Sequence, residues 1–309
     1  ASNNTALGHN SLLLNTTGAS NVAVGASALD ANTTGSTVTA VGAGALGANT
    51  TATNGTAVGG SALAANTTGS SNTAVGKNAL AANTTGAQNT TMGLESGKSI
   101  TTGTYNDFFG FRAGDLTTTA SNNVGIGSNT LGANTTGASN TAVGSSALVA
   151  NTTGANNVAV GSSALDANIT GTQNVAIGTD ALGANTTNNN TAVGYSALKV
   201  NTTGTGNASL GYSSLDANTT GSNNTAVGAD SLTTNTTGVS NTAIGQSALS
   251  AATTGDYNTA VGKDSLNAST TGYRNTAMGV DSLNDLTTGT HNSGFGQHAL
   301  NKITTGVYN

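Results

Sequence analysis

The side chains best suited to bind a ligand lie between Gly93 and Gly127. Only 3% of the 309 residues are aromatic and 6% are charged, yet this short segment holds many of both kinds. They include Glu95, Lys98, Tyr105, Phe108, Phe109, Phe111, Arg112 and Asp115. Aromatic and arginine side chains often supply most of the energy of a binding surface. The candidate binding residues are Tyr105, Phe108, Phe111 and Arg112.

A packing explanation of the same aromatic residues is favoured over the binding one. Sixteen copies of the repeat described below have Leu at one position, and Gly97 and Gly114 replace it in this segment. A Phe side chain can fill the volume that a missing Leu leaves in a core. The aromatic residues would then compensate for the lost leucines.

The histidines and the cysteine count give catalysis little support. The three histidines, His9, His291 and His298, are dispersed, and only the last two are near each other. The chain has no cysteine, which excludes thiol chemistry and cysteine-based metal sites. We expect neither enzyme activity nor a cofactor.

Two acidic residues are the strongest candidates for a metal site. Asp264 and Asp281 stand one repeat apart and could share a cation with main-chain oxygens. The favoured interpretation is that they are two solvated carboxylates beside Lys263. We therefore expect no metal site.

Threonine recurs at one position in every copy of the repeat, from Thr17 to Thr305. Evenly spaced threonines on a flat face could order water and bind ice. Against this, turn hydroxyls commonly bond to backbone groups, and the adjoining Gly and Asn predict a turn rather than a flat face. Ice binding is therefore an alternative, ranked below a structural role for Thr.

All of these side chains are positioned by a repeat of seventeen residues, typified by residues 140–156. A glycine closes each Asn-Thr-Ala-Val-Gly run, eighteen times from Gly8 to Gly296, at intervals of seventeen except for one of sixteen near Asn188. A constant period over the whole chain is typical of a solenoid. We expect residues 1–309 to be one continuous array and a segment of a longer fibre. The turn should absorb the missing residue, so that Ile177 and Val193 remain in register on neighbouring strands.

A column is the set of residues that occupy the same position in successive repeats. Two apolar columns are predicted to form the core. The residue before the motif glycine is apolar in all eighteen copies, and Leu stands four places after that glycine in sixteen. Thr or Val, then Ala, then Val gives the period-two alternation of a short strand, buried with Val on one face and Ala on the other. The Asn before the strand is interpreted as an amide ladder, and Asn-Thr-Thr-Gly as a turn.

The repeat length selects the fold class. Two packed helices do not fit in seventeen residues, and the recurrent Thr-Thr-Gly does not propagate a helix. The sequence therefore predicts an all-β fold, a parallel β-solenoid (β-roll) of about 18 rungs of 17 residues. One Val and one Leu per rung contribute roughly 3 to 6 kcal/mol on burial, less than the backbone ordering of a rung costs. We therefore expect the Ala faces of neighbouring chains to be buried against each other.

Charge and hydropathy exclude two classes of partner. The net charge is -5, and seven basic residues are scattered over eighteen repeats, which leaves no basic footprint for nucleic acid or an anionic membrane. No apolar run approaches the roughly 18 residues that a membrane-spanning helix needs. We expect neither nucleic-acid binding nor membrane insertion.

The strand of the repeat resembles a known motif. Residues 21–25 and 174–178, Asn-Val-Ala-Val-Gly and Asn-Val-Ala-Ile-Gly, are similar to the Val-Ala-Ile-Gly strand in the head repeats of bacterial trimeric autotransporter adhesins. The full repeat resembles those of phage tail-fibre-type proteins and related bacterial surface fibres. The resemblance covers the whole chain and implies a left-handed, parallel β-roll, assembled as a homotrimer and used for display and attachment. The adhesin-head repeat is shorter than the present one, which leaves open whether the origin is a phage or a cell surface.

These expectations converge on an extracellular structural or adhesive fibre, on a cell surface or a virion. Its partners would be further copies of the same chain and a cell-surface receptor or glycan, reached by multivalent contacts of the variable outward columns. The alternatives are a self-assembling extracellular filament subunit and an ice-binding β-solenoid that uses the Thr ladder.

Overall fold

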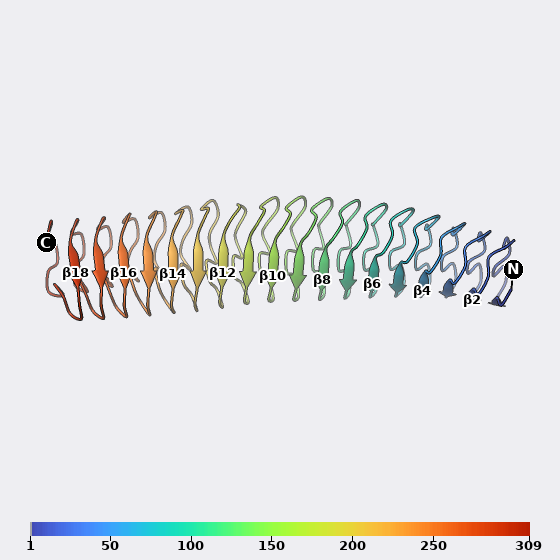
Figure 1. Ribbon diagram of the computed structural model, residues 1–309, viewed down its shortest axis with the longest axis horizontal. Helices are drawn as coiled ribbons and strands as arrows, with labels where there is room; N and C mark the ends of the chain where they lie inside the picture. Colours follow the sequence, from blue (N-terminus) through green and yellow to red (C-terminus); the bar gives the residue numbers. More distant parts are fainter. Residues whose placement is uncertain (1) are drawn as a thin grey trace. The chain divides into compact units, whose positions relative to one another are not determined.

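The chain folds as a parallel β-solenoid without helices in the described residues, 2–309 of the computed structural model (Figure 1). It divides into two compact units, which meet between Asn156 and Asn157 in the sequence, and each unit contains nine three-residue strands. The strands of the first unit are β1 Thr5–Leu7, β2 Val22–Val24, β3 Thr39–Val41, β4 Thr56–Val58, β5 Thr73–Val75, β6 Thr90–Met92, β7 Asp107–Phe109, β8 Val124–Ile126 and β9 Thr141–Val143. Those of the second unit are β10 Val158–Val160, β11 Val175–Ile177, β12 Thr191–Val193, β13 Ala208–Leu210, β14 Thr225–Val227, β15 Thr242–Ile244, β16 Thr259–Val261, β17 Thr276–Met278 and β18 Ser293–Phe295. The predicted fold class is confirmed.

Strands that follow one another in the chain pair in parallel within each unit, with equivalent residues opposite each other. Val24 of β2, for example, is in register with Val41 of β3. The short repeat does not disturb this register, because Ile177 of β11 still pairs with Val193 of β12. The prediction that the turn absorbs the missing residue is therefore confirmed. Among residues 2–309 there is also no helix long and apolar enough to span a membrane.

The core of most rungs is made by the Leu column and by the central Ala of the strand. Leu29 and Leu46 are buried, as predicted, and so are Ala23 and Ala40. Ala on the inner face leaves room for the Leu side chain of the same rung.

The Val column, predicted to be core, lies on the outer face of the strand instead. Its members are partly exposed, with Val58 at 38%, Met92 at 41% and Ile126 at 43%. The expectation that the Ala faces pack between chains is also wrong, because Ala already fills the interior of its own rung. Period-two alternation shows that the two faces differ but not which one points inward.

Two ladders of buried asparagine complete the interior. Asn21, just before β2, donates from Nδ2 to the Gly35 carbonyl at 2.9 Å, and its Oδ1 accepts the N–H of Val38 at 3.0 Å. Asn32, from the Asn-Thr-Thr-Gly turn, donates to the same Gly35 carbonyl at 3.0 Å and to Asn15 Oδ1 at 2.8 Å. The predicted amide ladder before the strand is thus confirmed, and a second one runs beside it.

The corners of the rung require left-handed backbone. Ser27, Leu29 and Thr37 have φ values of 54°, 55° and 59°, and equivalent residues recur along the array. Non-glycine residues rarely adopt this region, so the fold holds them there by stacking each corner on the next. At Gly25, with φ of 133°, a Cβ would lie 2.6 Å from the carbonyl carbon of Gly42, so the rungs approach too closely there for any side chain.

The two threonines of the turn have different environments. The first donates its hydroxyl to the backbone of the following rung, as from Thr33 to the Thr50 carbonyl at 3.0 Å and from Thr50 to the Thr67 carbonyl at 3.1 Å. The second, such as Thr34 or Thr51, is exposed. The structural role predicted for threonine therefore holds for the first position and not for the second.

Candidate functional site

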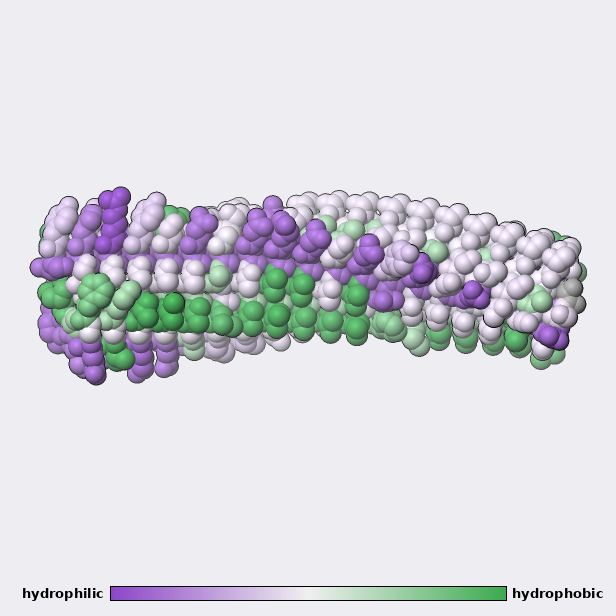
Figure 2. Space-filling model, viewed as in Figure 1, coloured by the Kyte–Doolittle hydropathy of each residue, from purple (hydrophilic) through white to green (hydrophobic). Residues whose placement is uncertain are grey.

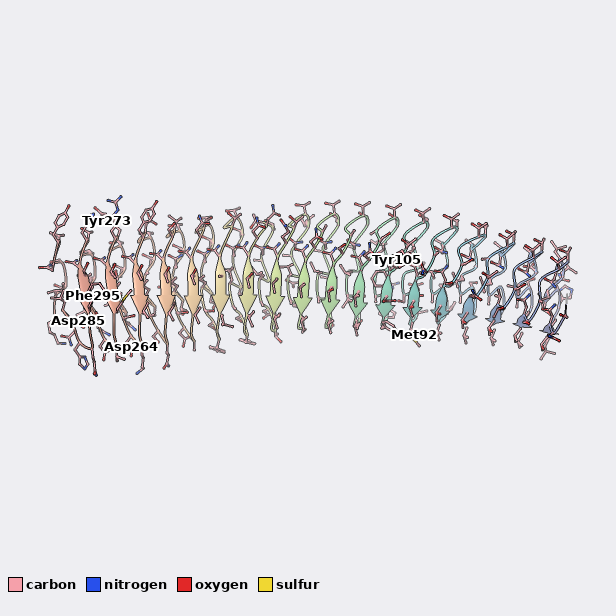
Figure 3. The ribbon with its side chains drawn as sticks, viewed as in Figure 1. Met92, Tyr105, Asp264, Tyr273, Asp285 and Phe295 are labelled. Carbon is pink, nitrogen blue, oxygen red and sulfur yellow. The ribbon has the colours of Figure 1, made fainter. Side chains whose placement is uncertain are left out.

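The structure separates the four predicted binding residues. Tyr105 is 54% exposed in the turn before β7 and is labelled just above the strands in Figure 3. Phe111, 45% exposed, and Arg112 follow the other end of β7. Phe108, in the middle of β7, is fully buried. The four residues therefore do not form one surface, and only Phe111 and Arg112 are neighbours.

Phe108 fills the space of a missing leucine, as the packing explanation predicts. Gly114 occupies the Leu position of its rung, and a Cβ there would clash with the Phe108 ring. The ring also reaches the next rung, where a Cβ on Gly125 would lie 2.8 Å from Phe108 Cδ1. One Phe thus replaces a Leu in its own rung and the methyl group of an Ala in the following one.

Arg112 belongs to an ion-pair cluster that joins two rungs. Its Nε lies 3.0 Å from Glu95 Oε2, and Lys98 Nζ lies 3.3 Å from Glu95 Oε1. The hydrogen bonds from Arg112 and then Lys98 hold the pKa of Glu95 below its usual value. The guanidinium carbon is also 5.3 Å from the centre of the Phe111 ring, within cation–π range. Because Glu95 pairs with both cations and the Asp115 carboxylate also interacts with them, the cluster offers a ligand little uncompensated charge.

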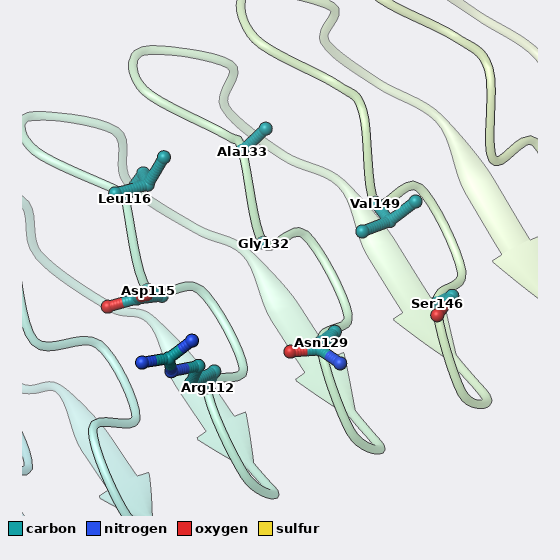
Figure 4. A pocket seen from close by; sticks show the side chains of 8 residues that line it. All are labelled: Arg112, Asp115, Leu116, Asn129, Gly132, Ala133, Ser146 and Val149. Carbon is teal, nitrogen blue, oxygen red and sulfur yellow. The ribbon is translucent and has the colours of Figure 1, made fainter.

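A shallow groove runs beside Arg112 along the following rungs (Figure 4). Its volume is about 320 Å³, and its lining residues are Arg112, Asp115, Leu116, Asn129, Gly132, Ala133, Ser146 and Val149. Burial raises the pKa of the Asp115 carboxyl, and Lys98 and Arg112 oppose that shift. The absence of a side chain at Gly132 opens the middle of the groove. Its lining combines one cation, one carboxylate and apolar walls, which suits weak binding of a small polar group rather than catalysis.

Two further aromatic clusters lie in the second unit, and none of their members was among the predicted binding residues. Tyr195 and Tyr212 stack with ring centres 5.6 Å apart and an interplanar angle of 10°. His291 stacks on Tyr308 at 4.8 Å and meets the edge of Tyr273 at 5.5 Å. The signal was present in the sequence, because residues one repeat apart in one column become neighbours once the rungs stack.

The candidate metal residues have local partners, a lysine for Asp264 and a histidine for Asp281. Lys263 Nζ lies 3.2 Å from Asp264 Oδ2, and His298 Nδ1 lies 3.5 Å from Asp281 Oδ2. Within residues 2–309, no group of three or more His, Cys, Asp or Glu side chains could hold a metal ion. Lys263 lies beside Asp264, as the interpretation of solvated carboxylates predicted.

Comparison with known proteins adds no identity: neither a protein-family model nor a curated protein matches this chain.

Proposed function

We propose that this chain is a segment of an extracellular structural or adhesive fibre, assembled from three copies and displaying its variable outward columns for multivalent attachment. The observation that carries the proposal is the apolar column on the outer face of the stacked strands. The residue before the motif glycine is apolar in all eighteen repeats. In each unit a band of hydrophobic side chains follows the strands (Figure 2).

An apolar stripe of this length calls for a covering partner, since soluble monomers rarely expose large contiguous apolar patches. The partner that fits every rung equally is another stack with the same period, which is a further copy of this chain. The homotrimer is the assembly implied by the resemblance of the repeat to the heads of trimeric autotransporter adhesins.

The energy available per rung is small and accumulates along the stripe. Fully burying a Val or Ile side chain contributes about 1.5 to 3 kcal/mol, so covering the exposed two-fifths contributes about 0.6 to 1.2 kcal/mol. If all nine rungs of one unit were this exposed they would contribute at most roughly 5 to 11 kcal/mol per chain, no more than the roughly 4 to 15 kcal/mol that association costs. Assembly therefore depends on many rungs engaging together.

Attachment would be carried by the columns that vary. The position after the motif glycine holds residues as different as Lys77, Phe111, Ser145 and Tyr195, and none of them is required by the interior. Each rung would contact a receptor or glycan weakly, and the assembled fibre would gain strength by avidity.

Light scattering of the purified chain tests the assembly. We expect a mass three times the 29.5 kDa of one chain. Replacing Met92→Asp and Ile126→Asp together should release folded monomers, because charged groups then face the apolar stripe. Ser145→Asp, at an exposed position of a variable column, is the matched control and should remain trimeric.

Two outcomes would refute the trimer. A wild-type chain that is folded by circular dichroism and monomeric at micromolar concentration leaves the stripe without a partner. A mass that grows without limit as concentration rises indicates the self-assembling filament instead.

A further inference from the structure

The second threonine of the turn is the one exposed column of the repeat that never changes. It is Thr in all eighteen repeats, from Thr17 to Thr305. The first threonine is replaced once, by Ile169, although its hydroxyl usually bonds to the next rung. An exposed column that is kept when others vary indicates a role outside the folded rung.

Hydrogen bonds of the side chain within the chain do not account for this constancy. The second threonines of the first unit are exposed in every rung: Thr17, Thr34, Thr51, Thr68, Thr85, Thr102, Thr119, Thr136 and Thr153. Among the described residues of that unit none of their hydroxyls bonds to the protein, whereas the hydroxyls of the first threonines do. Thr187, at the short repeat of the second unit, differs: it is half-buried and donates to the Gly204 carbonyl at 2.8 Å.

The surroundings of the first-unit ladder carry no charge. The neighbouring columns of the same turn contain Gly, Thr, Ala, Ser, Asn, Gln and one Tyr. All the Asp, Glu, Lys and Arg residues of the first unit lie in other columns. Each free hydroxyl offers one donor and two acceptors to water. Stacked parallel strands repeat about every 4.8 Å, so the nine rungs present hydroxyl and methyl groups at even intervals over about 38 Å.

We propose that this ladder, from Thr17 to Thr153, binds the surface of ice. A partner that contacts identical groups at a constant interval must itself be periodic, and a crystal surface of water meets that requirement. The hydroxyls would bind water molecules at the same spacing as the rungs. The methyl groups would exclude water molecules that do not match this spacing. The absence of charge matters because ionic groups hold hydration shells of their own.

The ladder and the apolar stripe occupy different parts of the rung, so this inference does not rest on the proposed assembly. In the first unit, Tyr105 marks the turn that carries the threonines, and Met92 belongs to the Val column. In Figure 3 Tyr105 is labelled above the strands and Met92 at the lower edge. A trimer formed through the stripe would leave the ladder facing water.

Growth of ice in a solution of the full chain tests the proposal. We expect the wild-type chain to enter the growing ice and to lower the freezing point below the melting point. Thr85→Tyr with Thr102→Tyr should lose most of both effects, because two bulky rings interrupt the ladder in adjacent rungs. Ser145→Tyr is the matched control, since the same column already holds Tyr195 and Tyr212, and it should behave as wild type.

Circular dichroism and light scattering complete the test. All variants should keep the wild-type spectrum and mass. The proposal is overturned if the folded wild-type chain is excluded from ice, or if Ser145→Tyr loses as much activity as the ladder variant. It is also overturned if the ladder variant changes the mass of the particle, because the threonines would then be a contact between copies.

Discussion

Phe108 provides the sharpest test of how a rung is packed. The ring replaces the Leu side chain absent at Gly114 and the Ala methyl group absent at Gly125. Phe108→Ala alone should leave a cavity and cost about 3 to 5 kcal/mol, the usual range for a fully buried Phe. Gly114→Leu alone should also destabilise, because its side chain would occupy the volume of the Phe108 ring.

Phe108→Ala and Gly114→Leu should compensate each other when they are combined with Gly125→Ala. The triple variant Phe108→Ala, Gly114→Leu and Gly125→Ala restores the residues that most rungs carry, at almost constant core volume. Volume-conserving exchanges usually cost less than about 1.5 kcal/mol. The triple variant should therefore be more stable than Phe108→Ala by at least about 1.5 kcal/mol. Leu is accommodated at this corner because Leu131 and Leu148 adopt the same left-handed conformation, with φ of 50° and 52°.

Amide hydrogen exchange over residues 90–131 is the appropriate assay, because a repeat array can open locally and its unfolding need not be two-state. Phe108→Ala should accelerate exchange in these rungs by about two to three and a half powers of ten, at about 1.4 kcal/mol for each. Rungs far from β7 are the internal control. A triple variant that exchanges as fast as Phe108→Ala would show that Phe108 does not substitute for the missing Leu.

Two further predictions concern the asparagine ladders and one half-buried carboxylate, Asp216. Asn106→Ala should destabilise its rung by about 1 to 3 kcal/mol, because Asn106 Nδ2 is the one side-chain amide that donates to the Ala120 carbonyl. Asn83→Ala should cost less, because Asn72 also donates to the Gly86 carbonyl. Equal losses of local stability, measured by hydrogen exchange, would contradict this prediction. Burial raises the pKa of Asp216 in the folded state, and Lys199 opposes that shift. The ionised carboxylate therefore lowers the free energy of unfolding at pH values above that pKa, and this loss disappears as the pH falls and the group is protonated. Asp216→Asn should therefore raise the melting temperature at pH 7 more than at pH 3, and calorimetry showing an equal gain at both pH values would refute the assignment.

Much of the fold was predictable because stacking makes each column homogeneous. A position that is Leu in sixteen repeats can only be a shared core position, and the Asn before the strand can repeat in an interior only if its amides bond to one another and to the backbone. The parallel register followed from the constant period, and the short repeat at Asn188 stayed in step because the strand itself lost no residue.

The inward face and the site were not predictable in the same way. Ala and Val alternate on the strand, and the choice between them depends on how much room Leu29 and the two Asn ladders leave inside, which only the closed rung determines. The cluster from Tyr105 to Arg112 looked like one site because its members are close in sequence. The strand between them places Tyr105 at one end and Phe111 at the other, with Phe108 inside.

The identity of contacts from rung to rung has a consequence for how such a gene can change. A duplicated or deleted stretch of one whole repeat would place the same backbone donors, amides and leucines against the same partners, so array length can change by recombination without any new interface having to evolve. An insertion inside a strand has no such freedom, because it would move every side chain of that rung to the opposite face. The single short repeat, with its deletion in the turn, is the kind of length change that this architecture permits.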